Sequence, residues 1–597
     1  MQKYSSRKDV PEKYKWDLTE YYKDEKDYDD NFNKCLKMVS DLKNYVGCTS
    51  DASRLYEFLK KDIETYGLCE DLYVYSFLVN DQELGNSKSM ERISKIENLF
   101  GEYSKNVSFF SPELLKLDKD KYDKLFKDNS ELSEFKDSLD KIYRDKDHVI
   151  SEREEKIVTD LVTAMDHFSD MSSTMLNSEH DYGKVSVSGE EEKITTTNFR
   201  RLMKNSDRKF RQEVREKYNK TLSNYAVSSA QFLDGYVKGN IASSRIHNYK
   251  DAWEAKLFNL NMPNEAYEML VKTTEENLDV LHEYYRVFKE SVKLDKLYQY
   301  DLYLDASKSN KEYSIEEAQE LCLKAISPLG EDYQKLFKKI FEKRYIDYAQ
   351  YPGKCSGGYS ASSIINDSRI LMSYNYDLES VSTIIHEGGH NVHHQMVNGN
   401  NLAQNREISN LMAEVASLTN ECLLSSYLAK NGTSLSEKKA GIDNILGVFV
   451  SNLFGAVREG KMEQDFYNYV SNGGSITKDY MNELTRKSLE KYYGKEVELD
   501  EYSNNSWMVR SHYYMNYYLY NYAFCISVAS YVASEILDGN KDMLKKYMKY
   551  LTTGSDVWPI DAFKILDVDL TKKDVYEKAI KYFASLLDEF KSMIEGE

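Results

Sequence analysis

Proline and glycine are scarce in this sequence, which has 6 prolines and 26 glycines among 597 residues. Because these residues most often interrupt regular structure, their scarcity argues against a fold dominated by turns and loops. Long stretches rich in Glu, Lys, Leu and Tyr indicate a mostly α protein. Domains commonly contain about 150 residues, so a chain of this length is expected to form several lobes.

Cysteine is also infrequent, and the seven cysteines are scattered, odd in number and free of Cys-x-x-Cys spacing. This pattern argues against a disulfide framework and indicates a reducing compartment. The first ten residues lack the apolar core of a signal peptide. A cytoplasmic location is therefore expected.

Basic residues are outnumbered, with 80 Lys and Arg against 99 Asp and Glu and a net charge of -19. Such a balance argues against nucleic acid as the main partner. Residues 511–534 contain no charged side chain and are long enough to span a bilayer. Their many Asn, Ser and Tyr groups would lack partners in lipid, so we expect a helix buried against a wet cleft and no membrane association.

Histidine is rare as well, yet four of the 10 histidines, His386, His390, His393 and His394, fall within nine positions. On a helix, His386 and His390 lie on one face and can bind the same tetrahedral Zn²⁺. Glu387, next to the first histidine, can then accept a proton from a water at the metal. The run from His386 to His390 therefore predicts a zinc-hydrolase helix.

A third ligand is expected from the apolar helical segment that follows, residues 410–421. Glu414 is a carboxylate inside this apolar stretch, where an unpaired charge is costly, and it is the best candidate. Glu421 lies seven residues further on nearly the same face. It could hold the second ring nitrogen of a ligand histidine.

These motifs resemble the M3 family of zinc oligopeptidases, specifically its bacterial oligoendopeptidase F branch. The resemblance implies a multi-lobed helical ellipsoid with a deep internal substrate channel and a small β-sheet element beside a zincin-type helix. The segments that carry it are residues 386–393, 413–417, 420–421, 7–18, 353–360 and the tyrosine-rich stretch from His512.

The same resemblance implies that a histidine and tyrosines of the 512–522 stretch stabilise the oxyanion of the tetrahedral intermediate. His512 is assigned to this role or to substrate contact. Tyr514, Tyr520 and Tyr522 remain open as alternatives.

Peptide binding is expected at Gly357-Gly358 and at a strand over residues 369–374. An extended peptide can add to an exposed sheet edge through main-chain hydrogen bonds, which demands little of its side chains. By resemblance, Tyr359 and His393 are also expected to contact the substrate.

The sequence thus predicts a zinc-dependent endopeptidase that hydrolyses internal bonds of short, unstructured oligopeptides, with one Zn²⁺ per chain held by His386, His390 and Glu414. Glu387 acts as the base and then protonates the leaving amine. Cleavage specificity, physiological substrate and oligomeric state stay open.

Two other functions are considered. An exopeptidase would need a group that captures a terminal carboxylate, and Arg510 or Arg369 could serve. A non-catalytic peptide-binding module with structural zinc would have no use for Glu387, since structural sites are closed by four protein ligands.

For domain organisation, the first ~180 residues contain amphipathic helices such as 51–65 and 151–176. Residues 184–197 have β-branched side chains around a Gly-containing turn and predict a small hairpin. We expect an N-terminal helical lobe at 1–183 and a catalytic domain at 184–597.

Overall fold

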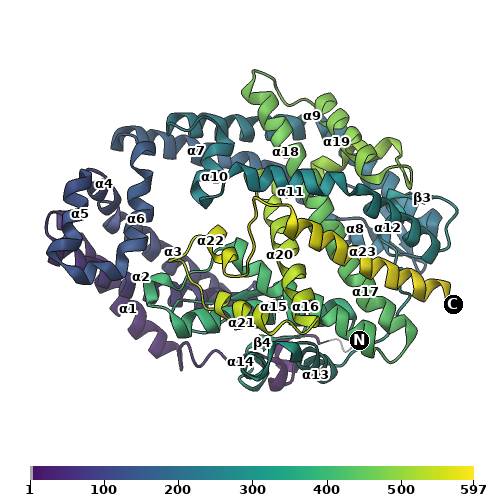
Figure 1. The fold of residues 1–597 in the computed structure, drawn as a ribbon, viewed down its shortest axis with the longest axis horizontal. Helices are drawn as coiled ribbons and strands as arrows, with labels where there is room; N and C mark the ends of the chain where they lie inside the picture. Colours follow the sequence, from purple (N-terminus) through teal and green to yellow (C-terminus); the bar gives the residue numbers. More distant parts are fainter. Residues whose placement is uncertain (1–3, 597) are drawn as a thin grey trace. The chain divides into compact units, whose positions relative to one another are not determined.

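The computed structural model describes residues 4–596, and most of them are helical (Figure 1). The described strands form two two-stranded pairs and one three-stranded sheet. The mostly α fold, predicted from composition, and the small β element, implied by the family resemblance, are both confirmed.

The chain divides into two compact units, each built from three segments. Unit 1 contains residues 1–147, 310–427 and 532–567, and unit 2 contains 148–309, 428–531 and 568–597. The sequence predicted an N-terminal lobe at 1–183 and a catalytic domain at 184–597. Compact units do not show which residues form a catalytic domain, so this division stays a prediction.

Unit 1 begins with helices that pack against one another in sequence order, α1 on α2 and α2 on α3 (Figure 1). Their core is aliphatic and aromatic, with Leu72, Leu78 and Ile96 fully buried. The helices of this unit are α1 (Glu25–Leu42), α2 (Ala52–Gln82), α3 (Ser87–Val107), α4 (Phe110–Leu115), α5 (Lys119–Asp128), α6 (Lys136–Arg144), α13 (Ile315–Ala325), α14 (Glu331–Glu342), α15 (Leu378–Asn400), α21 (Lys541–Tyr550) and α22 (Pro559–Lys564), together with most of α16 (Asn410–Asn431).

Unit 2 is organised around α9 (Arg208–Ile246), which contacts α7, α8, α10, α18 and α19. Its other helices are α7 (Glu152–Thr174), α8 (Thr196–Met203), α10 (Ala252–Leu260), α11 (Asn264–Glu276), α12 (Leu278–Ser291), α17 (Leu435–Phe449), α18 (Ala456–Ser471), α19 (Lys478–Tyr493) and α23 (Asp574–Glu595), together with most of α20 (Tyr520–Leu537). The parallel pair of β3 (Leu297–Tyr298) with β7 (Val497–Glu498) also belongs to it.

Two sequence predictions in the N-terminal third are confirmed. The predicted hairpin is β1 (Lys184–Val187) paired antiparallel with β2 (Glu190–Lys193). Its turn residues Ser188 and Gly189 both have positive φ, as a two-residue turn that follows the strand twist requires. The helix expected at 151–176 is α7, which starts with a capping box between Ser151 and Glu154.

The three-stranded sheet of unit 1 lies beside α15, because β5 and β6 both contact that helix. Its order is β4 (Ile346–Asp347), β6 (Arg369–Leu371), β5 (Tyr359–Ala361), with β6 parallel to β4 and antiparallel to β5. The central strand is therefore β6. The outer strand next to α15 is β5, which has a partner on one side only.

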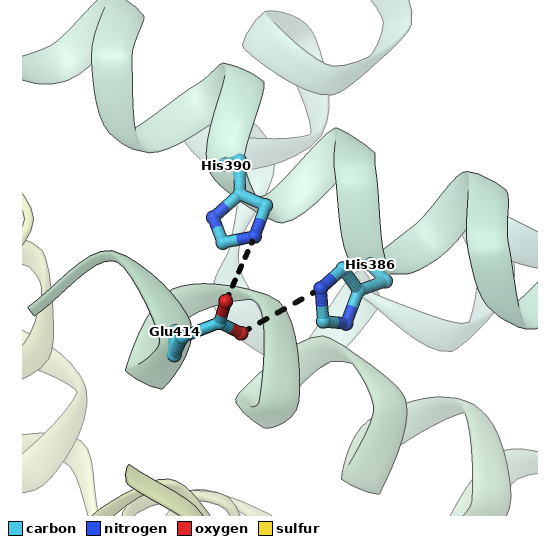
Figure 2. A group of neighbouring side chains, drawn as sticks. All are labelled: His386, His390 and Glu414. Atoms are coloured by element: carbon cyan, nitrogen blue, oxygen red, sulfur yellow. Dashed lines mark ion pairs between the residues drawn. The ribbon is translucent and has the colours of Figure 1, made fainter. Parts of the chain in front are cut away.

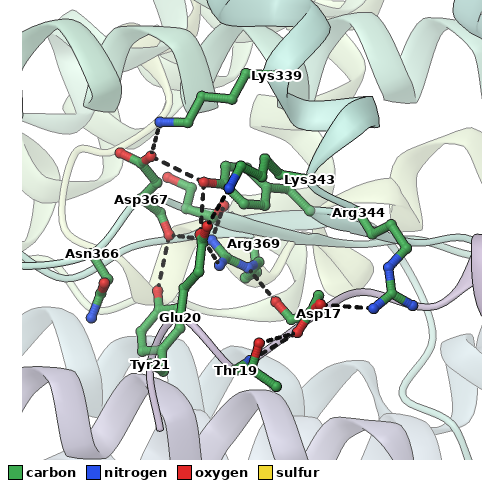
Figure 3. Close-up of polar contacts among 12 residues, drawn as sticks. Asp17, Thr19, Glu20, Tyr21, Lys339, Lys343, Arg344, Asn366, Asp367 and Arg369 are labelled. Carbon is green, nitrogen blue, oxygen red and sulfur yellow. Dashed lines mark hydrogen bonds and ion pairs between the residues drawn. The ribbon is translucent and has the colours of Figure 1, made fainter. Parts of the chain in front are cut away.

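Arg369, at the start of β6, is completely buried and ties the sheet to the N-terminal segment (Figure 3). Its guanidinium donates to the Asp17 carbonyl at 3.0 Å, to the Asp367 carbonyl at 2.9 Å and to a Glu20 carboxylate oxygen at 3.0 Å. It also lies 3.8 Å from the ring centroid of Tyr345. With its donors engaged inside the protein, Arg369 is not available to a peptide carboxylate. The suggestion that Arg369 could capture the terminal carboxylate of a substrate is therefore wrong.

The uncharged segment 511–534 is not one helix. A short turn of 3₁₀ helix covers Ser511–Tyr514, and α20 begins only at Tyr520. Asn516 and Tyr517 between them have φ values of 41° and 56°. The Tyr517 N–H donates to a carboxylate oxygen of the buried Glu463 at 2.6 Å. The Tyr517 N–H therefore bonds to a side chain and not to a helical carbonyl. The uncharged composition of the segment did not reveal this break.

A different stretch passes a test for membrane spans by length and composition. Among the described residues it is Leu435–Ser471, with a mean hydropathy of 1.4, and 56% of its most apolar window is buried. A core helix of a folded protein passes the same test, so this is weak evidence for a span.

Candidate metal centre

Helix α15 presents the two predicted histidine ligands on one face. It begins at Leu378, and its N-cap is Asp377, whose side chain accepts the Ser380 N–H. The His386 and His390 rings lie one turn apart in an edge-to-face arrangement with centroids separated by 4.9 Å. The i, i+4 spacing thus brings both imidazoles to one place.

Glu414, on α16, reaches between the two rings (Figure 2). Its carboxylate oxygens lie 3.6 Å from His386 Nε2 and 3.9 Å from His390 Nε2. One ligating atom from each of the three residues falls within 4.8 Å of the others. Their side chains are 14% to 26% exposed, so the cluster is accessible from outside.

The donor set fits a zinc ion. Ligands at about 2.0 to 2.1 Å from a tetrahedral zinc lie about 3.4 Å apart, close to the separations observed here. Two imidazoles and one carboxylate leave a fourth position open, as in catalytic sites.

The charges of the centre favour a cation. Burial lowers the pKa of His386, but the hydrogen bond to Glu421 and the surrounding carboxylates outweigh burial and raise the pKa to about 10. For His390, burial and the charge of His386 bring the pKa well below its usual value. His390 therefore has a neutral ring with a lone pair to offer.

Glu421 holds the far side of the first histidine. Its Oε1 is 2.6 Å from His386 Nδ1, and its Oε2 accepts the Ser382 hydroxyl at 3.2 Å. The structure thus brings Glu421 to the position expected of a residue that orients a ligand histidine and directs Nε2 toward the metal.

The two glycines between the histidines, Gly388 and Gly389, are not open to every residue type, although the spacing motif by itself places no restriction on these positions. A Cβ on Gly389 would lie 2.8 Å from the Ser417 Cα and 3.0 Å from the Ala416 carbonyl oxygen. A Cβ on Gly388 would lie 2.3 Å from a ring atom of Phe337 in α14. Both positions are glycine because neighbouring helices occupy the space of a side chain.

Glu387 lies next to His386 and is 9% exposed. Burial raises the pKa of its carboxyl to about 7, with the His386 charge opposing this and nearby carboxylates adding to it. A carboxylate with a pKa near neutrality is suited to take up and release a proton at physiological pH.

The exposed sheet edge lies beside Glu387, but on β5 rather than on the strand expected at 369–374. That strand, β6, is paired on both sides and cannot accept a peptide. Gly358 directly precedes β5, and a Cβ there would lie 3.9 Å from Glu387 Oε1 and 2.9 Å from Thr383. Gly357 has a φ of 96°, which favours glycine. The Gly357-Gly358 pair is therefore close to the metal centre.

The other two expected substrate contacts differ in position. The Tyr359 hydroxyl donates to Asp81 of α2 at 2.9 Å, and its ring packs against Phe77. His393 is 0% exposed and packs beside Tyr550. A fully enclosed side chain cannot touch a peptide, so the structure gives no support for His393 as a binding residue.

His512 and the tyrosine candidates lie in unit 2, where they fall into different environments. His512 and Tyr522 line the same cavity of about 390 Å³, and His512 Nε2 is 3.3 Å from the Tyr522 hydroxyl. Tyr520 is 1% exposed inside an aromatic cluster with Trp253. Tyr514 packs on Tyr236. Of the three tyrosines, Tyr522 alone shares the cavity of His512.

Arg510 lines the same cavity but is already paired. Its Nε and a terminal nitrogen lie 2.6 and 2.7 Å from the two carboxylate oxygens of Glu459. A bidentate pair of this kind satisfies the guanidinium fork. Neither arginine considered for carboxylate capture is therefore unpaired.

Several residues of the centre were not anticipated from the sequence as having a role. The Ser417 hydroxyl donates to Glu414 at 3.2 Å, and Asn420 donates to the Ile385 carbonyl at 3.2 Å. Ser382 could have been found, because it lies one helical turn before His386 on the same face. Ser417 and Asn420 carry no such signal, since their partners depend on how α16 meets α15.

Comparison with known proteins agrees with this geometry. Residues 201–582 match the model of peptidase family M3, and residues 113–182 match that of the oligopeptidase F N-terminal region. Oligopeptidase PepF of Bacillus subtilis is 29% identical over 591 residues, covering 98% of this chain and 88% of that protein.

Two solved structures share the fold. Oligoendopeptidase-F from Enterococcus faecium has a TM-score of 0.74 at 25% identity, covering 96% of this chain and 99% of that one. A structure from Chlamydophila abortus has a TM-score of 0.89 at 23% identity, covering 99% of this chain and 100% of that one.

The helical fold and the His, His, Glu centre with an adjacent acid define a metal-dependent peptidase. The family match extends over more than half of the chain. The chain belongs to peptidase family M3 and is a metalloendopeptidase, as the motif around His386 predicted.

The positions of Glu414 and Glu421 predict different losses on substitution. Glu414→Ala removes the carboxylate that lies between the two histidines and is expected to abolish stable metal retention, whereas Glu421→Ala should weaken metal binding by about 10- to 100-fold. Metal analysis after dialysis against graded chelator concentrations measures both. Wild-type metal content in Glu414→Ala would rule out the ligand assignment.

Proposed function

We propose that this protein is a zinc-dependent endopeptidase that cleaves internal bonds of short, unstructured oligopeptides. The observation that carries the proposal is the convergence of His386, His390 and Glu414 beside the buried acid Glu387. One zinc ion per chain is expected there.

A zinc ion held by the three ligands supplies Lewis acidity, which lowers the pKa of a water and polarises the substrate carbonyl. Glu387 accepts the proton of the attacking water and later delivers it to the leaving amine. Glu421 keeps His386 oriented throughout. No covalent acyl-enzyme is required.

The substrate is proposed to bind as an added strand on the outer edge of β5. Main-chain hydrogen bonds to Tyr359–Ala361 would give affinity without demanding particular side chains. Gly358 leaves room for the peptide backbone beside Glu387. The deep channel that the family resemblance implies, like the cytoplasmic location, remains a prediction.

His512 and Tyr522 are the proposed donors to the oxyanion of the tetrahedral intermediate. Their shared cavity and mutual contact support treating them as a pair. Tyr514 and Tyr520 become less favourable candidates because their rings are packed against other aromatic side chains.

The exopeptidase alternative is not favoured. It needs an unpaired cation for a terminal carboxylate, and both candidate arginines are engaged with acids of the protein. A peptide-binding module with structural zinc is also not favoured, because the chain belongs to a peptidase family.

Glu387→Gln should keep its metal and lose about 10²- to 10⁴-fold in kcat, because Gln retains the shape of Glu but cannot accept the proton. Metal analysis and peptide hydrolysis on the same preparation measure both quantities. Turnover near the wild-type rate would show that Glu387 is not the base.

Tyr522→Phe should lower kcat by about 10²-fold, since an oxyanion donor contributes mainly in the transition state. Tyr520→Phe is the matched control, because its hydroxyl is buried without a hydrogen-bond partner and should matter little. Steady-state kinetics of the two variants decide the assignment. The reverse order of effects would move the role to Tyr520.

Binding as an added strand predicts size selection. Short unstructured peptides, including ones with an amidated C-terminus, should be cut internally, whereas a stable folded domain containing the same bond should survive. Mass spectrometry of the products provides the measurement. Efficient digestion of the folded domain would indicate a general proteinase, and loss of cleavage on amidation would indicate an exopeptidase.

A further inference from the structure

A second cavity of unit 1, about 740 Å³, has no role in the chemistry described so far. Its walls come from one face of α2, from the loop after β5 and from the turn after α15. The lining includes Tyr56, Lys61, Gly67, Ile364, Ile365 and Arg406.

The loop after β5 links the substrate edge to this cavity, because it follows α15 away from the metal centre. Gly358 lies at Glu387, and further along the Ser362 hydroxyl lies 2.9 Å from His394 Nδ1. Asn398 Nδ2 then contacts the Ser363 carbonyl at 3.5 Å. The next residue of the loop, Ile364, is in the cavity wall.

The length of α15 gives the distance that a peptide must cover. Glu387 and Asn398 are eleven residues apart on this helix. At about 1.5 Å per helical residue they are about 16 Å apart. An extended peptide covers about 3.3 Å per residue, so about five residues reach from the base to the cavity.

The loop that forms the cavity wall is held rigidly. The Ile364 N–H donates to Glu70 at 2.7 Å, and the Ile364 carbonyl accepts from Arg406 at 2.8 Å. The Ser363 hydroxyl donates to Asp71 at 2.5 Å. The Ile365 side chain is nevertheless 53% exposed. The cavity wall is therefore held in place before a ligand binds, as in most small-ligand sites.

Gly67 makes room for this arrangement. It lies in the middle of the 31-residue helix α2, where glycine costs roughly 1 kcal/mol relative to alanine. A Cβ there would lie 3.1 Å from Ile364 Cδ1 and 3.5 Å from Ile365 Cδ1. Any side chain at this position would project into the cavity wall.

Charged groups of both signs line the rim, so it does not favour a ligand of one charge. Lys61 is paired with Glu64 at 3.0 Å. Lys60 lies 3.7 Å from Glu134. The Arg406 guanidinium is engaged with the carbonyls of Ile364 and Asn401. The aromatic ring of Tyr56 and the two isoleucines are the part of the lining that can pack on an apolar side chain.

We propose that this cavity is a remote subsite of the peptidase and binds an apolar side chain of the substrate about five residues N-terminal to the cleaved bond. The direction follows from antiparallel addition to β5, which is the more stable ladder and places the N-terminal part of the peptide toward Ile364. The inference rests on the proposed function.

The test uses matched peptides with one scissile bond. A long peptide has Leu at the fifth residue before the bond, a second has Asp there, and a short one begins two residues before the bond. Wild type should show a kcat/KM about tenfold higher for the Leu peptide than for the Asp peptide. Moving the Leu through neighbouring positions locates the register.

The ratio to compare is kcat/KM for the long Leu peptide divided by kcat/KM for the short peptide. Ile365→Asp should reduce this ratio by about tenfold. Gly67→Leu, which fills the cavity from α2, should do the same. Leu36→Asp is the control, because Leu36 is also about half exposed but lies on α1 outside the cavity. Circular dichroism checks that all variants fold.

An unchanged ratio in both cavity variants would overturn the subsite, and so would a preference found only on the C-terminal side of the bond. If wild type cleaves none of the peptides, the proposed function fails instead, since the short peptide does not depend on the cavity.

Discussion

Helices α15 and α16 approach so closely at Gly389 that a single methyl group would meet the backbone of α16. The metal centre depends on this distance, because the histidines are on one helix and both Glu414 and Glu421 are on the other. A carboxylate side chain spans only a few ångströms. Two helices separated by ordinary side chains would lie about 8 to 10 Å apart and leave these acids less well placed to reach both rings.

That close contact also concentrates negative charge. Three carboxylates surround His386 and raise the pKa of its ring, which stabilises the cationic form. Burial instead lowers the pKa of His390 and keeps that ring neutral. Carboxylates gathered in this way are costly unless a cation is shared among them. Burial, with a smaller contribution from the nearby carboxylates, raises the pKa of Glu387 to about 7, so the enclosed setting of the centre also prepares the base.

The substrate edge depends on a second buried charge. Arg369 connects β6 to the N-terminal segment and stacks on Tyr345, which holds the central strand in place. Leaving a buried partner of such a network unpaired typically costs about 3 to 5 kcal/mol. Since β5 pairs with β6, the stability of this network helps to determine where a peptide can lie relative to Glu387.

Local patterns in the sequence were sufficient for the helix-rich fold, the hairpin at β1 and β2, and the face that His386 and His390 share. These features depend on contacts between residues close in the chain, through the i, i+4 spacing and the turn at Ser188-Gly189. The apolar setting of Glu414 also singled it out correctly as the acid that meets both histidines.

Tertiary structure decided what depends on distant segments. Apolar alternation cannot distinguish a central strand from an edge strand, so only the pairing of β6 on both sides showed that the edge is β5. Burial of His393 beside Tyr550, the contact of Arg369 with Asp17 and the packing of Tyr520 on Trp253 each depend on a partner more than a hundred residues away in the chain. The sequence by itself determined which chemistry is present, because the donor groups lie within a few helical turns of one another along two helices. Which residues surround that chemistry depended on packing, since those contacts join different helices and strands that no local pattern relates to one another.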